Sequence, residues 1–583
     1  MTPASIIPVF GSQRPYADLN FAGGSFGLDG RSVSNLTALP GFTFTRASLA
    51  MGYDATGKLT YGPNNQALQS QTFDNASWAK TNATVTANAV TAPDGTATAD
   101  KLVEAATVGA HYVGQTLAPV GIPAVASVYA KAGERTQLAI QLGSSSAGYF
   151  NLSNGTVVSG ASAGISDAGN GWYRCWVSGT PSNQNFLLYT AVAGSVSYSG
   201  DSTSGIFIWG AQLEAVTYQT TPSTYYPTTT AAYYGPRLVY DPVTLASLGI
   251  LVEEARTNLL LQSQDFATTW TQDAVTVTAN STTSPDGTSN ADKVIETATT
   301  ANHRFRQIVT VSNATAYTYS VFIKAGERTW AFVEVISGAT DVFCYVNLST
   351  GALGGTINGT WTVTGVGNGW YRVSCTFTTA TTTAQAFNQL STGNGVTSYA
   401  GDGTSGAFFW QAQFELGTGA SSPIPTTTAA VTRAADDVAL TGISLPGPCS
   451  FVTEALAPAF ISTDARHTLS DGNTNNRLWL SYNGSILNVN AMVSSTGVSP
   501  VSSPTVAPGV AFKAGQSSNN GTYLSVTNGG SVSSASGAVM PTLTRLDVGK
   551  NAGSSLRYWN NTISRIRIYN SALTDAQLQS LTS

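Results

Sequence analysis

The chain contains one stretch of sequence twice, and this repeat limits what the chain can fold into. Gly-Asn-Gly-Trp-Tyr-Arg occurs at 169–174 and again, unchanged, at 367–372. Upstream of each copy, Lys-Ala-Gly-Glu-Arg-Thr occurs at 131–136 and at 324–329. The spacing between equivalent residues grows along the repeat, so the insertions fall between the matched blocks, where loops tolerate them. We infer two tandem copies of one domain.

Two cysteines of the repeat exchange places with valine between the copies. The first copy has Cys175 and Val177 where the second has Val373 and Cys375. These positions share one face of a strand because side chains alternate with a period of two. A thiol with a chemical role would not be replaced by valine, whereas a small buried apolar side chain would. We therefore predict that these cysteines belong to the core.

The composition predicts an all-β protein. The length of 583 residues allows roughly three to five domains. Only 10% of the residues are charged, compared with about 25% in ordinary soluble domains, while Thr and aromatic residues are plentiful. Many short alternating segments separated by turn residues, with no long helical period, indicate β-sandwiches. We expect tandem antiparallel jelly-roll β-sandwiches followed by a further sandwich at the C-terminus.

The charge and the cysteine content exclude several classes of partner. The formal net charge is −5 and the basic residues are scattered, so we expect no nucleic-acid surface. Four cysteines in a chain of this length do not form a disulfide framework. No apolar run approaches the ~20 residues of a membrane span, so we expect no membrane insertion. We also expect no cofactor and no metal.

The matched blocks and the turn-rich segments set the expected domain boundaries. Pro-Thr-Thr-Thr-Ala-Ala closes both copies, at 227–232 and at 425–430. The first 18 residues contain three prolines and no hydrophobic period, which is typical of a disordered terminus or of a strap that orders against a partner. The expected divisions are 1–66 (N-terminal anchoring arm and first strands), 67–232 (first jelly roll), 233–258 (connector), 259–432 (second jelly roll) and 433–583 (C-terminal sandwich).

Several segments resemble bacteriophage spike and fibre proteins, over roughly residues 18–435. They are Phe-Thr-Arg-Ala-Ser at 44–48, Tyr-Asp-Pro-Val-Thr at 240–244, Leu-Gly-Ile-Leu-Val-Glu-Glu-Ala-Arg-Thr-Asn-Leu-Leu at 248–260 and the two hexapeptide repeats. The resemblance implies carbohydrate-binding jelly rolls in a head spike, head fibre or tail fibre at the virion surface, assembled in the cytoplasm of the bacterial host. It also implies a homo-oligomer, for which we expect a homotrimer. Its expected partners are a phage capsid or tail protein, bound through the N-terminal arm, and host surface polysaccharide.

The first copy departs from this pattern where the chain leads into the jelly roll. It reads Tyr-Gly-Pro-Asn-Asn-Gln-Ala-Leu at 61–68 and lacks the full Glu-Glu-Ala-Arg-Thr-Asn block of the second copy. We therefore expect the approach to the first jelly roll to differ from the approach to the second.

The C-terminal sandwich, 433–583, resembles a concanavalin A-like (laminin-G-like) domain. The residues that carry this resemblance are 469–473, the strand with Leu478 and Leu480, 546–549, and 567–570. A capping box from Thr574 to Gln577 begins the one helix that the sequence clearly predicts. Neither resemblance brings a catalytic set of residues, so we expect no enzymatic activity.

Motifs that carry chemistry in other proteins have structural interpretations here. Gly-Ala-Ser-Ala-Gly at 160–164 matches a nucleophile elbow, but the residues after Ser162 do not predict a helix and the second copy lacks the motif. The histidines are isolated and have no partner at a metal-ligand spacing, so we expect no zinc site. They are His111, His303 and His467.

The carboxylates shared by both copies are expected to be structural. An acid and a base need two different environments, whereas identical duplication suits a turn or a strand end. These carboxylates are Glu134, Glu327, Glu214 and Glu415. For Asp201 and Asp402, in Tyr-x-Gly-Asp-x-Thr-Ser-Gly, two alternatives stay open: a ligand of a structural Ca²⁺, or the favoured turn aspartate that bonds its own backbone.

Sugar binding needs exposed aromatic faces with amides and carboxylates nearby. Trp330, Trp361 and Trp479 are the candidate carbohydrate-binding residues because they break the internal symmetry or point outward. Trp330 stands where the first copy has Gln137, Trp361 lies in a polar, loop-like stretch, and Trp479 alternates out of its strand's apolar face. Packing or a subunit contact is the alternative for each. The shared tryptophans are expected in the core or at an interface: Trp172, Trp370, Trp209 and Trp410.

The sequence therefore predicts a structural virion spike or fibre subunit that attaches to the phage particle and binds host cell-surface polysaccharide. Weak aromatic and hydrogen-bond contacts are multiplied by avidity in such an assembly. Two alternatives remain. One is a polysaccharide-modifying spike (depolymerase or deacetylase) with an unduplicated carboxylate pair at a subunit interface, and the other is a decoration protein without a ligand.

Overall fold

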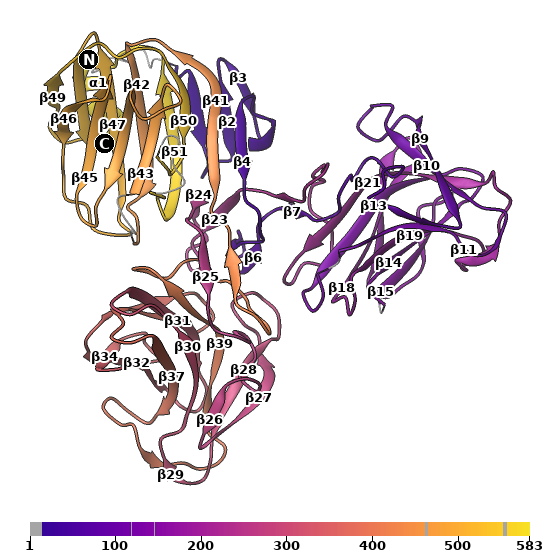
Figure 1. The fold of residues 1–583 in the computed structure, drawn as a ribbon, viewed down its shortest axis with the longest axis horizontal. Helices are drawn as coiled ribbons and strands as arrows, with labels where there is room; N and C mark the ends of the chain where they lie inside the picture. The colour runs from indigo at the N-terminus through magenta and orange to yellow at the C-terminus, as the bar shows by residue number, and fades with distance from the viewer. Residues whose placement is uncertain (1–13, 118, 145, 461–464, 552–556) are drawn as a thin grey trace, which may run out of the picture.

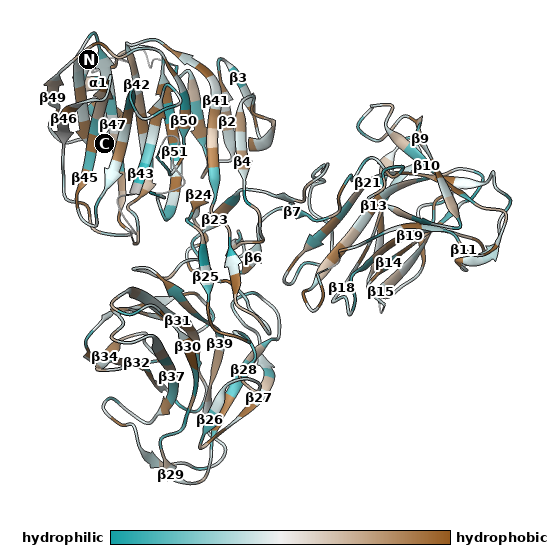
Figure 2. Cartoon of the chain, in the orientation of Figure 1, coloured by the Kyte–Doolittle hydropathy of each residue, from teal (hydrophilic) through white to brown (hydrophobic). Residues whose placement is uncertain are grey.

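The structure is a computed structural model, and it describes residues 14–117, 119–144, 146–460, 465–551 and 557–583. These residues form strands almost throughout and gather into three lobes (Figure 1). The predicted fold class, all-β with antiparallel sandwiches, is confirmed. Apolar and polar residues alternate along many strands in Figure 2, as the period of two requires. No helix within the described ranges is long and apolar enough to cross a membrane.

The first jelly roll consists of two six-stranded sheets that enclose an apolar core. One sheet has the order β17 (Ala163–Gly169), β18 (Trp172–Gly179), β13 (Ala124–Ala132), β21 (Gly205–Ala215), β10 (Ala99–Glu104) and β9 (Ala83–Val90). The other has the order β16 (Thr156–Ser159), β15 (Ser146–Asn151), β14 (Gln137–Leu142), β19 (Asn185–Ala191), β12 (Tyr112–Thr116) and β8 (Ala79–Thr81). A short ribbon pairs β11 (Val108–Ala110) with β20 (Ser197–Ser199).

The second jelly roll repeats this architecture. Its first sheet has the order β27 (Val275–Thr282), β28 (Ala291–Glu296), β39 (Gly406–Leu416), β31 (Ala316–Ala325), β36 (Trp370–Thr378) and β35 (Thr360–Gly365). Its second sheet has the order β26 (Thr271–Asp273), β30 (Arg304–Thr310), β37 (Thr383–Ser391), β32 (Trp330–Ser337), β33 (Thr340–Asn347) and β34 (Leu353–Ile357). The ribbon pairs β29 (Thr300–Ala301) with β38 (Tyr399–Ala400). Tyr319 and Val321 of β31 face the core.

The third lobe, which we call the platform, is a sandwich of a ten-stranded and a seven-stranded sheet. The larger sheet contains β3 (Arg31–Val33), β2 (Ser25–Leu28), β1 (Ala17–Asn20), β51 (Asn561–Tyr569), β42 (Cys449–Leu456), β47 (Ala511–Asn519), β48 (Thr522–Thr527) and β49 (Ser533–Ser536), with β23 (Arg237–Tyr240) and β24 (Ser247–Val252) at the side. The smaller sheet has the order β4 (Phe42–Thr45), β41 (Asp437–Leu445), β50 (Leu543–Asp547), β43 (Ala465–Ser470), β44 (Arg477–Tyr482), β45 (Leu487–Val493) and β46 (Thr496–Ser502).

The platform is built from three separate parts of the chain, which the expected linear divisions did not show. β1 pairs with β51 and β4 pairs with β41, so the N-terminal strands lie inside the C-terminal sandwich. The connector strand β24 also pairs with β51. Leu19 and Phe21 are buried in the platform core, and the burial of these apolar side chains favours the position of the N-terminal strands in this sandwich. The two jelly rolls are therefore insertions between parts of the platform. Residues 1–13 of the expected arm lie outside the described residues.

Helical structure is confined to two short elements of the platform within the described ranges. A 3₁₀ turn, η1, spans Leu36–Ala38. The α-helix α1 spans Asp575–Thr582, and its N-terminus has the predicted capping box between Thr574 and Gln577. Leu578 anchors it on the outer side of the larger sheet, where it contacts β47 and β48.

Candidate functional site

Each jelly roll is joined to the rest of the molecule by a two-stranded stalk. β7 (Asn64–Asn65) pairs with β22 (Tyr233–Tyr234) between the platform and the first jelly roll, and β25 (Arg256–Asn258) pairs with β40 (Val431–Arg433) at the second (Figure 1). The segment that enters each jelly roll thus lies beside the segment that leaves it. This arrangement lets a complete domain be inserted into a loop of the platform.

A buried asparagine closes each stalk in the same way. The Asn258 side chain donates to the carbonyl oxygens of Ala412 and Ile424, and its oxygen accepts from two backbone amides. Asn65 makes the same four bonds in the first jelly roll. The asparagine of Glu-Glu-Ala-Arg-Thr-Asn therefore has a counterpart in the first copy, although the rest of that block is missing there.

The first glutamate of this block, Glu253, belongs to an ion-pair network at the centre of the molecule. Arg46 and Arg237 contact Asp436 at 2.8 and 2.5 Å. Arg237 also contacts Glu253 at 2.7 Å, and Arg433 lies 3.5 Å from the same carboxylate. All five side chains are at most 4% exposed. We call these five residues the hub, and they tie the N-terminal strands, the connector and the exit from the second jelly roll together.

The electrostatics of the hub keep its carboxylates ionised. Burial acts to raise the pKa of Asp436, but the guanidinium groups of Arg237 and Arg46 outweigh burial, so this pKa lies below its ordinary value. The pKa of Glu253 is lowered against burial in the same way, by Arg433 and Arg237. Burial lowers the pKa of Arg46 to about 10, which leaves this side chain charged at neutral pH. The Glu-Glu-Ala-Arg-Thr-Asn signature therefore has a structural role.

The hairpin of β5 (Met51–Tyr53) and β6 (Leu59–Tyr61) contacts both jelly rolls. Towards the first jelly roll, the Thr217 hydroxyl donates to the Leu59 carbonyl at 3.1 Å and the Tyr218 hydroxyl donates to Asp54. Towards the second, the Leu59 amide donates to the Pro285 carbonyl at 2.9 Å, and Leu59 packs against the buried tryptophans of that domain. The hairpin and the hub together hold the three lobes in contact.

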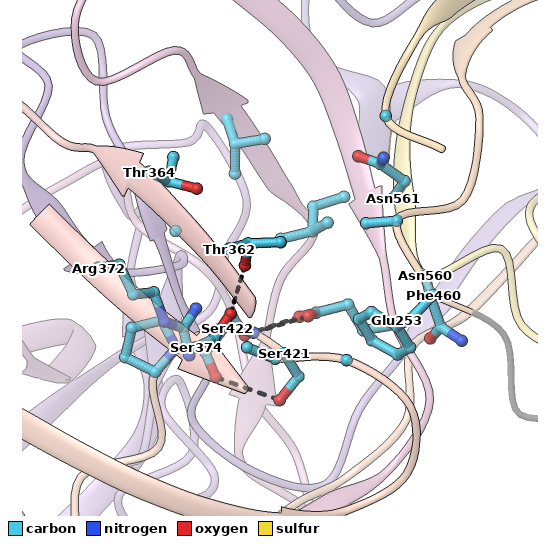
Figure 3. Close-up of a pocket in the computed structure, with 18 of the residues that line it drawn as sticks. Glu253, Thr362, Thr364, Arg372, Ser374, Ser421, Ser422, Phe460, Asn560 and Asn561 are labelled. Carbon is cyan, nitrogen blue, oxygen red and sulfur yellow. Dashed lines mark hydrogen bonds between the residues drawn. The ribbon is translucent and has the colours of Figure 1, made fainter. Parts of the chain in front are cut away.

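A cavity of about 550 Å³ lies where the second jelly roll, the hairpin, the connector and the platform meet. Figure 3 shows its walls. β35 and β36 contribute hydroxyl groups, among which Thr362 and Ser374 lie 2.6 Å apart, and Arg372 lies beside them. Asn560 and Asn561 of the platform form the opposite end. We call this space the junction cavity.

A second feature is the outer face of the sheet that contains β32, on the side away from the core. Five aromatic side chains project from this side, and none of them belongs to the apolar core of the domain. We call them the aromatic face: Trp330, Phe332, Phe343, Tyr345 and Phe387. Phe332 is the centre of the group, with its ring centroid 4.8 Å from Tyr345 and 5.2 Å from Phe343. Phe332, Tyr345 and Phe387 are at most 6% exposed, whereas Trp330 and Phe343 are partly exposed.

Charged and polar groups surround the aromatic face. The guanidinium groups of Arg304 and Arg306 lie 4.8 and 5.6 Å from the centre of the Phe387 ring. Glu334 stands on β32 directly opposite Phe387 and Phe343 in the strand register. Burial, and then the nearby Asp341 carboxylate, raise the pKa of Glu334 to about 7. Hydrogen-bonding groups thus stand next to apolar rings, which is the combination that recognises a sugar.

The equivalent face of the first jelly roll carries different residues. Tyr112 and Tyr189 form a cross-strand pair with ring centroids 4.8 Å apart, and the Tyr189 hydroxyl donates to Gln141 at 2.8 Å. Strand β14 is the equivalent of β32. Gln137 begins β14 as Trp330 begins β32, and Gln141 and Glu334 each follow four residues later on the same side of the sheet. The buried framework is duplicated while this face differs, so the two faces present different chemistry.

The structure places the three predicted tryptophans in three different sheets. Trp330 lies on the aromatic face and is partly exposed. Trp361 is on β35, where it packs against the core of the second jelly roll and donates to the Asn358 carbonyl at 3.1 Å. Trp479 points away from the platform core, as expected, but it is only 8% exposed and lies between Arg477 and Arg466. Only Trp330 therefore belongs to a group of outward aromatic side chains.

Sequence reasoning missed the neighbours of Trp330. Phe332 alternates with the core residues Ala331 and Val333, and Tyr345 alternates with Cys344 and Val346. A strand with large apolar residues on both faces is the signal that could have revealed them, since the inner face alone suffices for the core. The sequence analysis instead selected single tryptophans by their asymmetry between the copies.

The duplicated carboxylates serve turns and strand ends. Glu134 and Glu327 each accept from a lysine at 2.8–2.9 Å and from a backbone amide. Glu415 accepts from the amide and the hydroxyl of Ser421 at 2.9 and 2.6 Å. The Asp201 carboxylate is occupied by the amides and hydroxyls of its own turn, and Asp402 repeats this arrangement. Of the two alternatives for these aspartates, the structure supports the turn.

The remaining candidate motifs also have structural explanations. The four cysteines are buried, which confirms the prediction for Cys175 and Cys375. Ser162 is followed by strand β17, whereas a nucleophile elbow needs a helix there. His111 and His303 are buried beside Tyr198 and Tyr399. Among the described residues, no group of three or more His, Cys, Asp or Glu side chains is arranged to hold a metal ion.

The shared tryptophans are buried at equivalent places, as predicted. Trp172 and Trp209 are 1% and 4% exposed, and Trp370 and Trp410 are 2% and 0% exposed. In the first jelly roll, Tyr225 covers Trp209 with its ring centroid 4.9 Å away. In the second, the hairpin covers the equivalent pair. These residues are therefore not available to a ligand.

Comparison with known proteins gives weak likenesses only. No family model matches the chain, and no curated protein matches it. One solved structure is domain 4 of an extracellular GH43 arabinanase from Geobacillus stearothermophilus, in complex with arabinotriose. It is 18% identical to this chain with a TM-score of 0.21, and the match covers 28% of this chain and 82% of that one. Domains LG4–5 of the mouse laminin α1 chain are 10% identical with a TM-score of 0.17, covering 48% of this chain and 90% of that one. The LG1–3 region of the laminin α2 chain is also 10% identical with a TM-score of 0.17, covering 81% and 97%.

Proposed function

We propose that this chain is a non-enzymatic polysaccharide-binding protein that binds through the aromatic face of its second jelly roll. The observation that carries the proposal is the group of five aromatic side chains outside the core, next to Arg304, Arg306 and Glu334. The apolar side of a pyranose ring stacks on an aromatic ring, while amides and charged groups bond its hydroxyls. Phe332, Tyr345 and Phe387 are at most 6% exposed, so Trp330 and Phe343 supply the accessible ring surface.

The first jelly roll supplies a second, different sugar-binding face in this proposal. Its three tyrosines, Tyr112, Tyr149 and Tyr189, share the outer side of one sheet. Two faces on one rigid chain raise the apparent affinity for a long polymer by increasing the effective concentration of the second contact. The hub and the hairpin support this role because they hold both jelly rolls against the platform.

We further propose that the chain is a spike or fibre subunit of a bacteriophage particle. This part rests on the resemblance of residues 44–48, 240–244 and 248–260 to such proteins. In this assignment the N-terminal residues attach the subunit to the capsid or tail, the subunit forms a homotrimer at the virion surface, and its ligand is the surface polysaccharide of the bacterial host.

A glycan array with the labelled full chain tests the binding proposal. We expect binding to one family of polysaccharide fragments, reduced more strongly by Trp330→Ala than by Gln137→Ala at the same position of the first jelly roll. Incubation of the bound polysaccharide with the protein should release no reducing ends and no acetate. Release of either product would favour a polysaccharide-modifying spike, and absence of all glycan binding would favour a decoration protein.

A further inference from the structure

The junction cavity contains an arginine that lacks the partner of its counterpart in the first jelly roll. Arg174 and Arg372 are the same residue of the repeated hexapeptide. Arg174 donates through Nη1 to the Ser223 carbonyl at 2.5 Å and through Nη2 to Ser127. Arg372 keeps the equivalent bond to Ser320 at 2.9 Å, but within the described residues its Nη1 has no counterpart of the Ser223 bond, while Nε is unpaired in both arginines.

The difference follows from the length of one loop. In the first jelly roll, Glu214 accepts a hydrogen bond from the amide of Ser223, which lies nine residues later in the sequence. The Ser223 carbonyl in turn accepts from Arg174. In the second jelly roll, Glu415 accepts from the amide of Ser421, which lies six residues later, so the loop between the two residues is three residues shorter. The shorter loop leaves one edge of the Arg372 guanidinium facing the junction cavity, of which Arg372 is a wall residue (Figure 3).

The charges around Arg372 do not balance. The four guanidinium groups of Arg46, Arg237, Arg372 and Arg433 interact with three carboxylates. These carboxylates are Glu253, Glu415 and Asp436. One positive charge is left over beside the cavity. A guanidinium N–H without a partner matches a carboxylate, which accepts a charge-assisted hydrogen bond from it.

The rest of the cavity is suited to a sugar. β35 presents the exposed hydroxyls of Thr360, Thr362 and Thr364 on one wall, and hydroxyl groups both donate to and accept from sugar hydroxyls. Asn560 is 3% exposed, lines the opposite end, and its Nδ2 has no hydrogen-bond partner within the described part of the chain. A volume of about 550 Å³ is in the range of ligand sites, which occur preferentially where domains meet.

We propose that the junction cavity binds a carboxylate-bearing sugar, with the acid group on Nη1 of Arg372 and the ring hydroxyls on the threonines of β35 and on Asn560. This site is separate from the aromatic face, which lies on the other sheet of the same jelly roll. The chain would then recognise an acidic residue of a polysaccharide at the point where its three lobes meet.

Calorimetric titration of the full chain with a panel of uronate oligosaccharides, each paired with its neutral methyl ester, tests this proposal. We expect at least one acid to bind about 10-fold more tightly than its ester, which corresponds to one charge-assisted contact. Arg372→Gln should abolish this preference. Arg174→Gln is the matched control and should preserve it, since Arg174 already has its partner.

Two further measurements keep the test decisive if Arg372→Gln does not fold. Thr362→Trp fills the cavity from an exposed position and should block binding of the acid, while Trp330→Ala should leave it unchanged. The proposal is overturned if no acid binds better than its ester, if Arg174→Gln removes the preference equally, or if a tetraglutamate peptide binds as well as the sugar acid. Loss of acid binding by Trp330→Ala would place the ligand on the aromatic face instead.

Discussion

Arg46 and Asp436 stand 390 positions apart in the sequence, and their side chains meet at 2.8 Å in the centre of the molecule. Both side chains are at most 1% exposed. The pair joins the first strands of the platform to the segment that leaves the second jelly roll. It also explains why Phe-Thr-Arg-Ala-Ser and the distant Glu-Glu-Ala-Arg-Thr-Asn block occur in one chain, because both segments serve the same buried network.

Asp436→Asn should destabilise the protein strongly, since it leaves two buried guanidinium groups without their shared counter-charge. We expect a loss of about 3–5 kcal/mol in the free energy of unfolding. The neighbouring Asp437 offers a matched control, because its carboxylate is 50% exposed and contacts Lys550 at 2.5 Å. Asp437→Asn should cost less than about 1 kcal/mol. Equal losses in urea unfolding would contradict the account of the hub.

Acid should weaken the hub. The pKa values of Glu253 and Asp436 are lower in the folded chain than in the unfolded chain. Their contribution to stability is therefore complete above the unfolded value of about 4 and is lost as the pH falls below it. Calorimetry should show that Glu253→Gln is less stable than the wild type at pH 7, and that the gap narrows towards pH 3. A gap that does not change with pH would be inconsistent with this linkage.

Glu334→Gln should have the opposite pH dependence. The folded pKa of Glu334, about 7, is above its unfolded value, so ionising this group opposes folding as the pH rises through 7. Glutamine is also the residue type that the first jelly roll has at the equivalent position, Gln141. We expect Glu334→Gln to have a melting temperature similar to the wild type at pH 5 and a higher one at pH 8.5. A constant difference at both pH values would refute the assignment.

Asn65→Ala and Asn258→Ala should have similar costs. Each substitution removes four hydrogen bonds and leaves buried backbone groups unpaired, at about 1–3 kcal/mol for each such group. Limited proteolysis should show that each variant loosens the jelly roll that contains it and leaves the other protected. Loss of both jelly rolls in either variant would show that they do not fold as separate units.

The sequence was sufficient for features that depend on local pattern. The tandem repeat, the burial of Cys175 and Cys375 and the capping box at Thr574 all follow from neighbouring residues. Each of these predictions is confirmed because the period of a strand and the cap of a helix are short-range effects.

The sequence was insufficient for features that depend on distant partners. Leu19 pairs with Ile566, and nothing in either segment indicates the other, so the platform could not be recognised as discontinuous. The same holds for Arg46 and Asp436. The aromatic face needs Trp330, Phe343 and Phe387 from three strands, and only the register of the sheet brings them together.

The most direct test of the central claim is the affinity of the full chain for the strongest glycan on the array, measured by calorimetry for wild type, Trp330→Ala and Gln137→Ala. The account predicts that Trp330→Ala weakens binding about 10-fold or more, with an unchanged melting temperature, while Gln137→Ala weakens it less. Equal affinity of all three proteins would contradict the assignment of the aromatic face as the sugar-binding site.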